Sequence, residues 1–542
     1  MRGADHLAGA MAQAGVEVVF SLSGNQIMPL YDALIDPGIR IVHSRHEAAA
    51  VFMADAYAQV SGRIGVALVT AAPGFGNALG ALYTAAMSES PVIFLSGDSP
   101  VGLDGKGAFQ EFPQGAAARP FVKASERVQD AGDLAPAFAR AVRLAKAGRP
   151  GPVHLALPFD VLNADVGPAV PMTSADFAAP VRSADPEMLA AIQARLAAFE
   201  RPLLLAGPSL NVLRGGDRLA KLGAALDLPA IALESPRGLR DPALGAFAEV
   251  LATADCLFFL GKATDFMSGF GGMAQSSAAA VILVDPDPTA IARAKETLGG
   301  RLELTAIADP GPVAAALTAA GSGGAARAAW RREVADALAC RAEPEHTQAM
   351  HAAEVGAVVQ SALQDSADAI LICDGGEFGQ WIQATTRIPR RIINGPSGAI
   401  GAALPYAIGA RLAQPDAPLV ALMGDGTAGF HLSEFETAAR ERTAFAVIVG
   451  NDARWNAEQV IQVRDYGAQR KIGCDLLPGA RYDKAAEALG CRGFHVTEAG
   501  QLQGALVDAL SGGAPTCIDV AIAPQAAPNV SRKSPEPAKA PA

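Results

Sequence analysis

Short apolar runs recur along the chain and alternate with longer segments of helical character. Each run holds four or five residues and is rich in Val, Leu, Ile and Phe, as is typical of strands buried on both faces of a sheet. Strands that alternate with helices form parallel sheets covered by helices on both sides, so the pattern predicts an α/β protein. The eight clearest runs are Val66–Thr70, Val92–Leu95, Val153–Leu157, Pro202–Ala206, Cys256–Leu260, Val281–Val284, Leu419–Leu422 and Phe445–Val449.

Two stretches of loop-forming composition interrupt this alternation. Residues 163–186 are rich in Ala, Pro and Asp, and a second break combines the glycines of residues 321–324 with residues 342–345. A chain of 542 residues is too long for one core and long enough for three domains of ordinary size. The predicted units are three doubly wound parallel-sheet domains at residues 1–165, 185–320 and 350–525, followed by a flexible Pro- and Ala-rich tail at residues 526–542.

Charge and composition exclude several classes of partner. The formal net charge of −11 argues against a nucleic-acid partner, and the apolar runs are broken well before the roughly 20 residues that span a bilayer. The first six residues hold one basic residue and no apolar signal core, which argues against export. Six scattered cysteines without a Cys-x-x-Cys pair suit reduced thiols, so we expect a cytoplasmic protein without a membrane partner.

The segment Gly424-Asp425-Gly426-Thr427 comes directly after a predicted strand. Glycines at such a strand end allow backbone N–H groups to approach a phosphate, while the carboxylate holds the cation that neutralises it. Asp452 lies 27 positions further on, just after the next apolar run, and offers a second hard oxygen. The backbone carbonyl of Arg454 offers a third. The pattern therefore predicts a magnesium diphosphate site at two neighbouring strand ends.

A simple turn is the alternative interpretation of this segment, because Asp-Gly is common between strands. The residues that follow favour the phosphate site. Ser433-Glu434-Phe435-Glu436 has the pattern of a capping box, which predicts that a helix begins just beyond the loop.

These segments resemble the signature of thiamine-diphosphate-dependent enzymes, in which Gly-Asp-Gly is followed by a helix, a strand and an Asn-Asn or Asp-Asn pair. Many relatives carry Asn where this chain has Asp452. Residues 45–50 resemble the activating-glutamate motif of the same superfamily, residues 72–77 its pyrimidine loop and residues 157–161 the end of its first domain. The pattern is most similar to the acetolactate synthase, benzaldehyde lyase and oxalyl-CoA decarboxylase branch. The resemblance implies thiamine diphosphate and Mg²⁺ as cofactors.

The resemblance assigns Glu47 to the cofactor rather than to the substrate. In the family a buried glutamate hydrogen-bonds N1′ of the aminopyrimidine and favours the imino tautomer, whose 4′-nitrogen removes the C2 proton of the thiazolium. From the residues alone, Glu47 is equally a first-turn helix charge. The implied cofactor-binding residues are Pro73, Asn77, Gly376, Glu377, Phe378, Gly398, Ile400, Gly424, Asp425, Gly426, Thr427, Asp452 and Trp455. Of these, Ile400 would lie under the bend of the cofactor, and the Gly398 carbonyl would accept from its 4′-amino group.

Two glutamines are candidates for contact with the substrate. Gln26 stands where lyase relatives place a histidine, and Gln110 matches a glutamine that lines the same pocket. Either side chain could hydrogen-bond a carbonyl or hydroxyl of the reacting molecule. Because Gln26 does not ionise, proton transfers there would fall to the cofactor's amine, to water or to His46. Ordinary packing is the alternative for these glutamines, as it is for Trp455 and the residues that follow it.

The sequence also departs from particular relatives. Acetolactate synthases carry a lysine where Phe159 stands and Met-Val-x-Gln-Trp-Gln where residues 455–460 have Trp-Asn-Ala-Glu-Gln-Val. Flavin-binding relatives have Gly-Met-His-Gly in the central domain, where residues 237–242 have Arg-Gly-Leu-Arg-Asp-Pro, so we do not expect FAD. Arg532 and Lys533 in the tail could fold over a CoA ester, although a solvated tail is the simpler interpretation.

The prediction from these observations is a carbon–carbon bond lyase or carboligase. It would resemble acetolactate synthase without being one, and would act on a 2-oxo acid, an acyloin or a 2-hydroxyacyl compound. A 2-oxo acid or oxalyl-CoA-type decarboxylase is the alternative. In relatives each active site takes its glutamate from one subunit and its diphosphate anchor from another, which implies a homodimer or homotetramer.

Two further classes stay open at this point. The glycines at positions 74, 76 and 80, with Asp98 at the end of the next strand, form a loose dinucleotide fingerprint, so a nicotinamide or flavin oxidoreductase is a minority alternative. A non-catalytic binding module is the other, since a fold can lose its chemistry. Glu47 argues against that second class.

Overall fold

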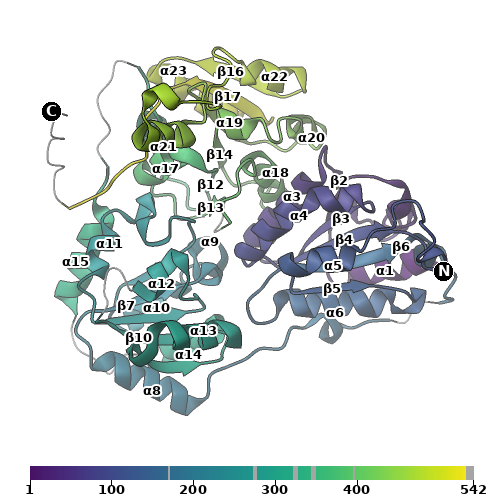
Figure 1. The fold of residues 1–542 in the computed structure, drawn as a ribbon, viewed down its shortest axis with the longest axis horizontal. Coiled ribbons are helices and arrows are strands. Elements are labelled where there is room, and N and C mark those ends of the chain that lie inside the picture. The colour runs from purple at the N-terminus through teal and green to yellow at the C-terminus, as the bar shows by residue number, and fades with distance from the viewer. Residues whose placement is uncertain (169–170, 273–277, 322–326, 343–348, 395–396, 533–542) are drawn as a thin grey trace.

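Three parallel sheets organise the chain, as the alternation of runs predicted (Figure 1). The computed structural model describes residues 1–168, 171–272, 278–321, 327–342, 349–394 and 397–532. In Figure 1 the N-terminal sheet lies at the right, the central one at the lower left and the C-terminal one at the top. Every pair of neighbouring strands in the described sheets is parallel, so each connection crosses over through a helix.

The N-terminal sheet has six strands in the order β2-β1-β3-β4-β6-β5. Its inner strands are fully buried, which explains their uninterrupted apolar sequences. The strands are β1 (Val18–Ser21), β2 (Arg40–His43), β3 (Gly65–Val69), β4 (Val92–Asp98), β5 (Ala124–Arg127) and β6 (Val153–Pro158). The helices are α1 (Gly3–Gln13), α2 (Met28–Ala33), α3 (Glu47–Ser61), α4 (Pro73–Met87), α5 (Gln114–Ala118), α6 (Leu134–Lys146) and α7 (Phe159–Asn163).

The C-terminal sheet repeats this topology, with the order β13-β12-β14-β15-β17-β16. Each of its strands occupies the place that its counterpart holds in the first sheet, so the two domains are built on one plan. The strands are β12 (Ile370–Cys373), β13 (Arg391–Ile393), β14 (Leu419–Gly424), β15 (Ala446–Asn451), β16 (Arg492–Val496) and β17 (Thr516–Ala521). The helices are α16 (Ala352–Leu363), α17 (Gly376–Thr385), α18 (Ala403–Ala413), α19 (Asp425–Ala428), α20 (Glu434–Arg440), α21 (Asn456–Tyr466), α22 (Tyr482–Ala488) and α23 (Ala499–Ser511).

The central sheet has five parallel strands in the order β11-β10-β9-β7-β8. The order of the strands along the chain reverses between β7 and β9, as in other doubly wound folds. Its strands are β7 (Pro202–Ala206), β8 (Ala230–Ala232), β9 (Cys256–Leu260), β10 (Ala280–Val284) and β11 (Leu302–Ala306). Its helices are α8 (Pro186–Ala197), α9 (Val212–Gly215), α10 (Arg218–Ala225), α11 (Phe247–Leu251), α12 (Gly269–Gly272), α13 (Pro288–Leu298), α14 (Pro310–Ala320) and α15 (Ala328–Ala339).

The first and last domains share one apolar core. Helix α3 packs against α18, and a single cluster of buried side chains runs from β3 and α3 into α18 and β14. Within it the Tyr406 hydroxyl donates to the Asp55 carboxylate at 2.7 Å, and both side chains are buried. A buried polar pair of this kind favours one arrangement of the two helices over alternatives that would leave either group unpaired.

Ion pairs and hydrogen bonds of largely buried arginines join the central domain to its neighbours. Arg391 at the edge of the C-terminal sheet pairs with Glu234 at 2.5 Å and with Asp241 at 2.8 Å. Arg214 of the central domain donates to the Ser88 carbonyl of the N-terminal domain at 2.6 Å. Removing one member of a buried pair leaves the other charge uncompensated, so these contacts tie the domains together.

The described part of the tail follows an extended path from the C-terminal sheet to the central domain. The Trp381 indole donates to the Ala526 carbonyl at 2.7 Å, and Val530 packs against both domains. Arg532 pairs with Glu333 at 3.4 Å. Lys533, considered above as a CoA contact, lies outside the described residues. Among the described helices, none has both the length and the apolar character that crossing a bilayer requires.

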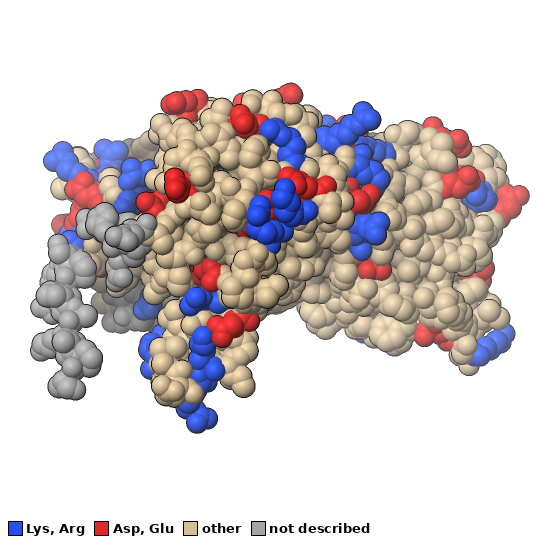
Figure 2. Space-filling view, turned by 90° about the horizontal axis from the view of Figure 1, so that it is seen from above, with Lys and Arg blue, Asp and Glu red and all other residues tan. Residues whose placement is uncertain are grey.

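The molecular surface carries charges of both signs. On the face drawn in Figure 2, basic and acidic side chains are interspersed and broad areas carry neither.

Candidate active site

A pocket of about 330 Å³ opens at the carboxyl ends of β14 and β15. These strands are neighbours, and Gly424 stands beside Gly450 in their register. The two sequence segments therefore leave the sheet side by side, which is where open parallel sheets bind ligands. The predicted residues that line the pocket are Gly376, Glu377, Phe378, Gly398, Ile400, Gly424, Asp425, Gly426, Thr427, Asp452, Arg454 and Trp455.

Two carboxylates line this pocket, close enough for the charge of one to affect the other. Asp425 is only 3% exposed; its Oδ1 accepts from the Gly426 N–H at 2.8 Å, and its buried Oδ2 has no partner among the described residues. Burial raises the pKa of Asp425 to about 6. Burial and the negative charge of Asp425 raise the pKa of Asp452 to about 7. A hard divalent cation between them would remove the repulsion and occupy the free oxygen, so the residues fit Mg²⁺.

Backbone geometry on the rim of the pocket favours an anionic ligand. The short helix α19 begins at Asp425, directly after β14, so the N–H groups of its first turn lie at the end of this strand. A Cβ at Gly426 would lie 2.7 Å from the Trp455 ring, so a larger residue would push the indole away. The predicted capping box at Ser433 is not formed. Ser433 has helical backbone angles and makes no side-chain cap bond. The expected helix is nevertheless present, since α20 begins at Glu434 after residues 429–433, which follow α19.

Asp374 was not predicted, although it shapes one wall of the pocket. This buried carboxylate accepts from the N–H groups of Gly375, Gly401 and Ala403 at 2.7 to 3.1 Å. It thereby fixes the loop that carries Gly398 and Ile400. Gly398 has φ +70° and Gly401 has φ +87°, values that favour glycine. The signal was the acidic residue directly after β12, a position that also belongs to the carboxyl edge of the sheet.

Helix α17 closes the next wall. It begins at Gly376, and the buried Phe378 ring packs against Gly450 at the end of β15. Burial raises the pKa of Glu377, and the nearby charge of Glu458 acts in the same direction. Arg237 of the central domain also lines the pocket, and its positive charge lowers the pKa of Glu377 and so opposes the effect of burial.

A second group of predicted residues meets in the N-terminal domain. Glu47 is the first residue of α3 and is 7% exposed. The Asn77 side chain donates to its Oε2 at 3.0 Å, from helix α4, which begins at Pro73. His46 caps α3, since its Nδ1 accepts from the Ala48 N–H at 3.1 Å. Its Nδ1 lone pair is therefore engaged, which leaves only Nε2 for the proton transfer considered above.

The two predicted glutamines contact each other. Gln26 is buried; its Nε2 donates to Gln110 Oε1 at 2.7 Å, and its Oε1 accepts from the Thr70 hydroxyl at 2.7 Å. Thr70 was not predicted as part of the site. Gln110 has φ +59°, an uncommon conformation for a residue with a side chain. Strain of this kind persists where neighbouring contacts hold it and is frequent at binding sites.

These two groups do not line one pocket within the chain. The described residues that line the 330 Å³ pocket come from the central and C-terminal domains, and none of Glu47, Asn77, Gln26 and Gln110 is among them. Exposed aromatic side chains flank both groups. Phe109 and Phe112 are exposed and lie close to Gln110 in the sequence, and the exposed Phe430 follows the loop that carries Asp425.

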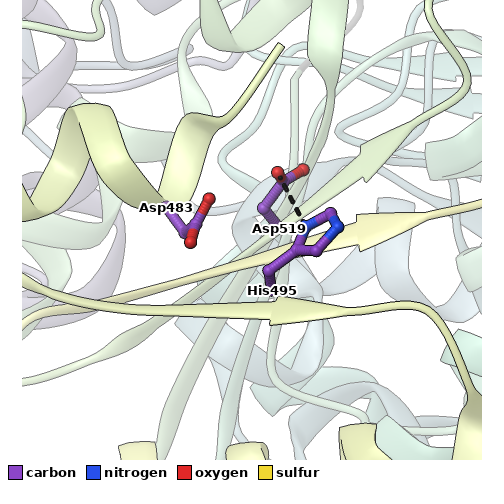
Figure 3. A group of neighbouring side chains, drawn as sticks. All are labelled: Asp483, His495 and Asp519. Atoms are coloured by element: carbon purple, nitrogen blue, oxygen red, sulfur yellow. Dashed lines mark hydrogen bonds and ion pairs between the residues drawn. The ribbon is translucent and has the colours of Figure 1, made fainter. Parts of the chain in front are cut away.

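A cluster of possible metal ligands elsewhere in the domain has a structural role. Figure 3 shows Asp519 and His495 on adjacent strands joined by a hydrogen bond, with Asp483 opposite them. Arg481 already neutralises Asp483 at 2.6 Å. Asp519 accepts from Asn451 Nδ2 at 3.1 Å, and Asn451 is the residue before Asp452. The cluster therefore supports the loop that carries the second carboxylate of the site.

In the structure, the acidic residue on which the dinucleotide-binding alternative depends is already paired. Asp98 is buried and forms an ion pair with Arg127 at 2.6 Å, so it is not available to a ribose. The glycines at positions 74, 76 and 80 lie inside α4 rather than in a loop.

Comparisons with known proteins agree with this geometry. Residues 1–117 match the thiamine pyrophosphate enzyme N-terminal TPP binding domain, and residues 374–520 match the C-terminal TPP binding domain. The Rhodococcus jostii RHA1 thiamine diphosphate-dependent 4-hydroxybenzoylformate decarboxylase has a similar fold, with a TM-score of 0.80 at 24% identity over 97% of this chain and all of that one.

Full-length relatives carry several activities in their names. A probable acetolactate synthase of Mycobacterium bovis is 28% identical, covering 96% of each chain. Human 2-hydroxyacyl-CoA lyase 2 is 29% identical over 91% of this chain and 84% of its own. Escherichia coli oxalyl-CoA decarboxylase is 26% identical over 95% and 94%. The chain therefore carries the N-terminal and C-terminal TPP-binding domains of thiamine pyrophosphate enzymes.

Proposed function

We propose that the protein is a thiamine-diphosphate- and Mg²⁺-dependent lyase or carboligase that makes or breaks a carbon–carbon bond next to a carbonyl. The observation that carries this proposal is the buried Asp425 Oδ2, which has no hydrogen-bond partner among the described residues, together with the nearby carboxylate of Asp452 at the end of the adjacent strand. Buried polar atoms are rarely left without a partner, so a bound cation is the simplest account of this one.

The C-terminal domain would hold the metal and the diphosphate. Asp425, Asp452 and the Arg454 carbonyl are the proposed metal ligands, and the first-turn amides of α19 would bind phosphate oxygens. The loop braced by Asp374 would place Ile400 under the bend of the cofactor and offer the Gly398 carbonyl to its amino group. When bound, thiamine diphosphate supplies a C2 carbon that becomes a nucleophile toward carbonyl groups.

The N-terminal domain would supply the carboxyl group that exchanges a proton with the bound cofactor. Glu47 lies in a nearly dry position and is oriented by one hydrogen bond from Asn77. No hydrogen bond to Glu47 Oε1 is formed by the described residues, so this oxygen could exchange a proton with one bound nitrogen base. Gln26, Gln110 and Thr70 form a chain of neutral hydrogen-bonding groups, suited to orient a substrate oxygen without transferring a proton.

The proposed substrates are 2-oxo acids, acyloins or 2-hydroxyacyl compounds. The relatives named as a lyase and as a synthase favour bond cleavage or formation between carbons. A 2-oxo acid or oxalyl-CoA-type decarboxylase is the second candidate, which the similarity to Escherichia coli oxalyl-CoA decarboxylase favours. A panel of these three substrate classes, assayed with cofactor and Mg²⁺ present, would separate the candidates by product analysis.

We further propose a homodimer or homotetramer in which each active site lies between two chains. The supporting observation is that the diphosphate pocket and the Glu47 group occupy different places in one chain. A two-fold axis would bring each group to its complement on the second copy. The exposed rings of Phe109, Phe112 and Phe430 beside the two half-sites would then be buried in the interface.

Removal of the metal should abolish activity. Protein treated with a chelator and dialysed is expected to show no turnover, and to regain it only when thiamine diphosphate and a divalent cation are both added, because two carboxylates repel the diphosphate unless a cation lies between them. Calorimetry should show cofactor binding that depends on Mg²⁺. Tight binding of NAD or FAD without any response to thiamine diphosphate would contradict the proposal.

A further inference from the structure

The turn before Glu47 is held by a side chain from the other end of the protein. Glu434, the first residue of α20 in the C-terminal domain, is 0% exposed. Its Oε1 accepts from the backbone N–H of Arg45 at 2.9 Å, and its carboxylate also accepts from the N–H of His46. Its Oε2 accepts from the Thr437 hydroxyl at 2.7 Å. The carboxylate is therefore fully engaged, with two of its bonds on the residues that lead into Glu47.

This contact meets a physical need of helix α3. The first N–H groups of a helix and its cap have no partners inside the helix, and a negative charge near them is favourable. His46 caps the helix and pairs with the Ala48 N–H, but the N–H groups of Arg45 and His46 need acceptors from elsewhere. Glu434 supplies them, and burial away from water strengthens each bond.

Neighbouring contacts keep α20 against the same turn. Arg40 pairs with Glu441 at 2.6 Å, and Arg440 donates to the His43 carbonyl. Both contacts join β2, the strand that leads into this turn, to the C-terminal end of α20. The helix therefore cannot shift along the turn without breaking them, and the Glu434 carboxylate is held in register with Arg45 and His46.

The ring of His431, which precedes α20, connects the turn before Glu47 with the loop that carries Ile400 in the C-terminal domain. Its ring packs edge-on against those of His46 and Phe52, with centroids 5.6 Å apart in both cases. Burial lowers the pKa of His431 to about 4, so near neutral pH the ring is uncharged, and its Nδ1 carries the proton that it donates to the Gly401 carbonyl at 2.8 Å. The segment from His431 to Glu434 thus touches the Ile400 loop on one side and the Glu47 turn on the other.

We propose that Glu434 is a positioning residue for Glu47: by accepting from Arg45 and His46 it sets where α3 begins, and so where the Glu47 carboxylate lies. This inference rests on the proposed function, in which Glu47 exchanges a proton with the bound cofactor. A displacement of about 1 Å in a reacting group can cost on the order of 100-fold in rate, so a side chain that only holds the turn has a measurable effect.

The first test measures exchange of the C2 proton of bound thiamine diphosphate alongside turnover. Glu434→Leu should slow both by about 10- to 100-fold, because Glu47 loses its position. Its affinity for Mg²⁺ and cofactor, measured by calorimetry, should stay unchanged, since the diphosphate anchor is elsewhere. Glu434→Gln keeps an acceptor oxygen and should retain most of the exchange rate. Glu487→Gln, an exposed carboxylate on α22 of the same domain that pairs with Lys484, is the control and should match the wild type.

The second test uses mixed dimers. Glu434 lies in the same domain as Asp425, but we expect it to affect the part of the active site that contains Glu47 of its own chain. When a Glu434→Leu chain is refolded with an Asp425→Ala chain, one site of the mixed dimer is intact. That site combines the correctly placed Glu47 of the Asp425→Ala chain with the Asp425 of the Glu434→Leu chain. Activity should return to about a quarter of all sites. The same chain refolded with Glu47→Gln should show no recovery, since both sites then have a damaged Glu47 half.

The outcomes separate this role from general destabilisation. If Glu434→Leu fails to recover with Asp425→Ala while Glu47→Gln does recover with it, Glu434 damages both half-sites and the positioning role is overturned. If Glu47→Gln also fails to recover, the two-chain site is wrong, and the exchange rate of Glu434→Leu alone decides: an unchanged rate overturns the role. If Glu434→Leu does not fold, Glu434→Asp, which withdraws the carboxylate by one methylene, takes its place with the same expected order of effects.

Discussion

Chains carrying Glu47→Gln and chains carrying Asp425→Ala are each expected to be inactive, and to regain activity when they are refolded together. A mixed dimer would contain one site with both changes and one with neither, because a two-fold axis exchanges the contributions. Random pairing makes half of the dimers mixed, so about a quarter of all sites should recover. The recovery from none to a quarter is the largest change that we expect from the proposed assembly.

The experiment needs proof that the chains exchange. Native mass spectrometry of differently tagged chains gives the mixed fraction, and the specific activity should rise in proportion to it. Refolding either variant with itself is the control and should stay inactive. A mixture with confirmed exchange that remains as inactive as its parents would show that Glu47 and Asp425 serve one site within one chain.

Glu47→Gln by itself should lower turnover by about 10²- to 10⁴-fold, the usual contribution of a positioned proton-transfer group. The amide keeps the shape of the side chain and can still contact Asn77, so the fold should be unaffected. Exchange of the C2 proton of the bound cofactor, followed by NMR after acid quench, should slow together with turnover.

Binding separates this role from a general loss of the site. Affinity for Mg²⁺ and thiamine diphosphate should change little in Glu47→Gln, because the proposed anchor is Asp425 and Asp452. Asn77→Ala, which removes the orienting donor but not the carboxylate, should have a smaller effect on exchange. An exchange rate equal to that of the wild type would return Glu47 to the role of a first-turn helix charge.

The buried strands were predictable because burial on both faces leaves an uninterrupted apolar signal. The run Cys256–Leu260 coincides with β9, and Val153–Leu157 with all but the last residue of β6. Edge strands gave no such signal. β2, β5 and β13 lie at sheet edges and carry Arg or half-buried positions, so their sequences resemble those of loops.

Half of the candidate site was predictable for a similar reason. Asp425 and Asp452 each follow a buried strand, and adjacent parallel strands place their carboxyl ends together. Asp374 was missed although it also follows a strand, because the loop that it holds contributes the backbone amides of Gly401 and Ala403, 27 and 29 residues away, and backbone groups carry no sequence signature. Thr70 was missed because its only evident role is the hydrogen bond to Gln26, 44 residues away.

The sequence by itself determined the fold class, the number of sheets and the position of Asp425 and Asp452 at strand ends, since each depends on residues close together in the chain and on the exclusion of water from apolar runs. Tertiary structure decided which groups meet. The Asn77–Glu47 bond, the Gln26–Gln110 bond and the Arg45–Glu434 contact join residues 30, 84 and 389 positions apart. Such hydrogen bonds depend on how domains pack, and packing leaves no local periodicity from which they could be predicted.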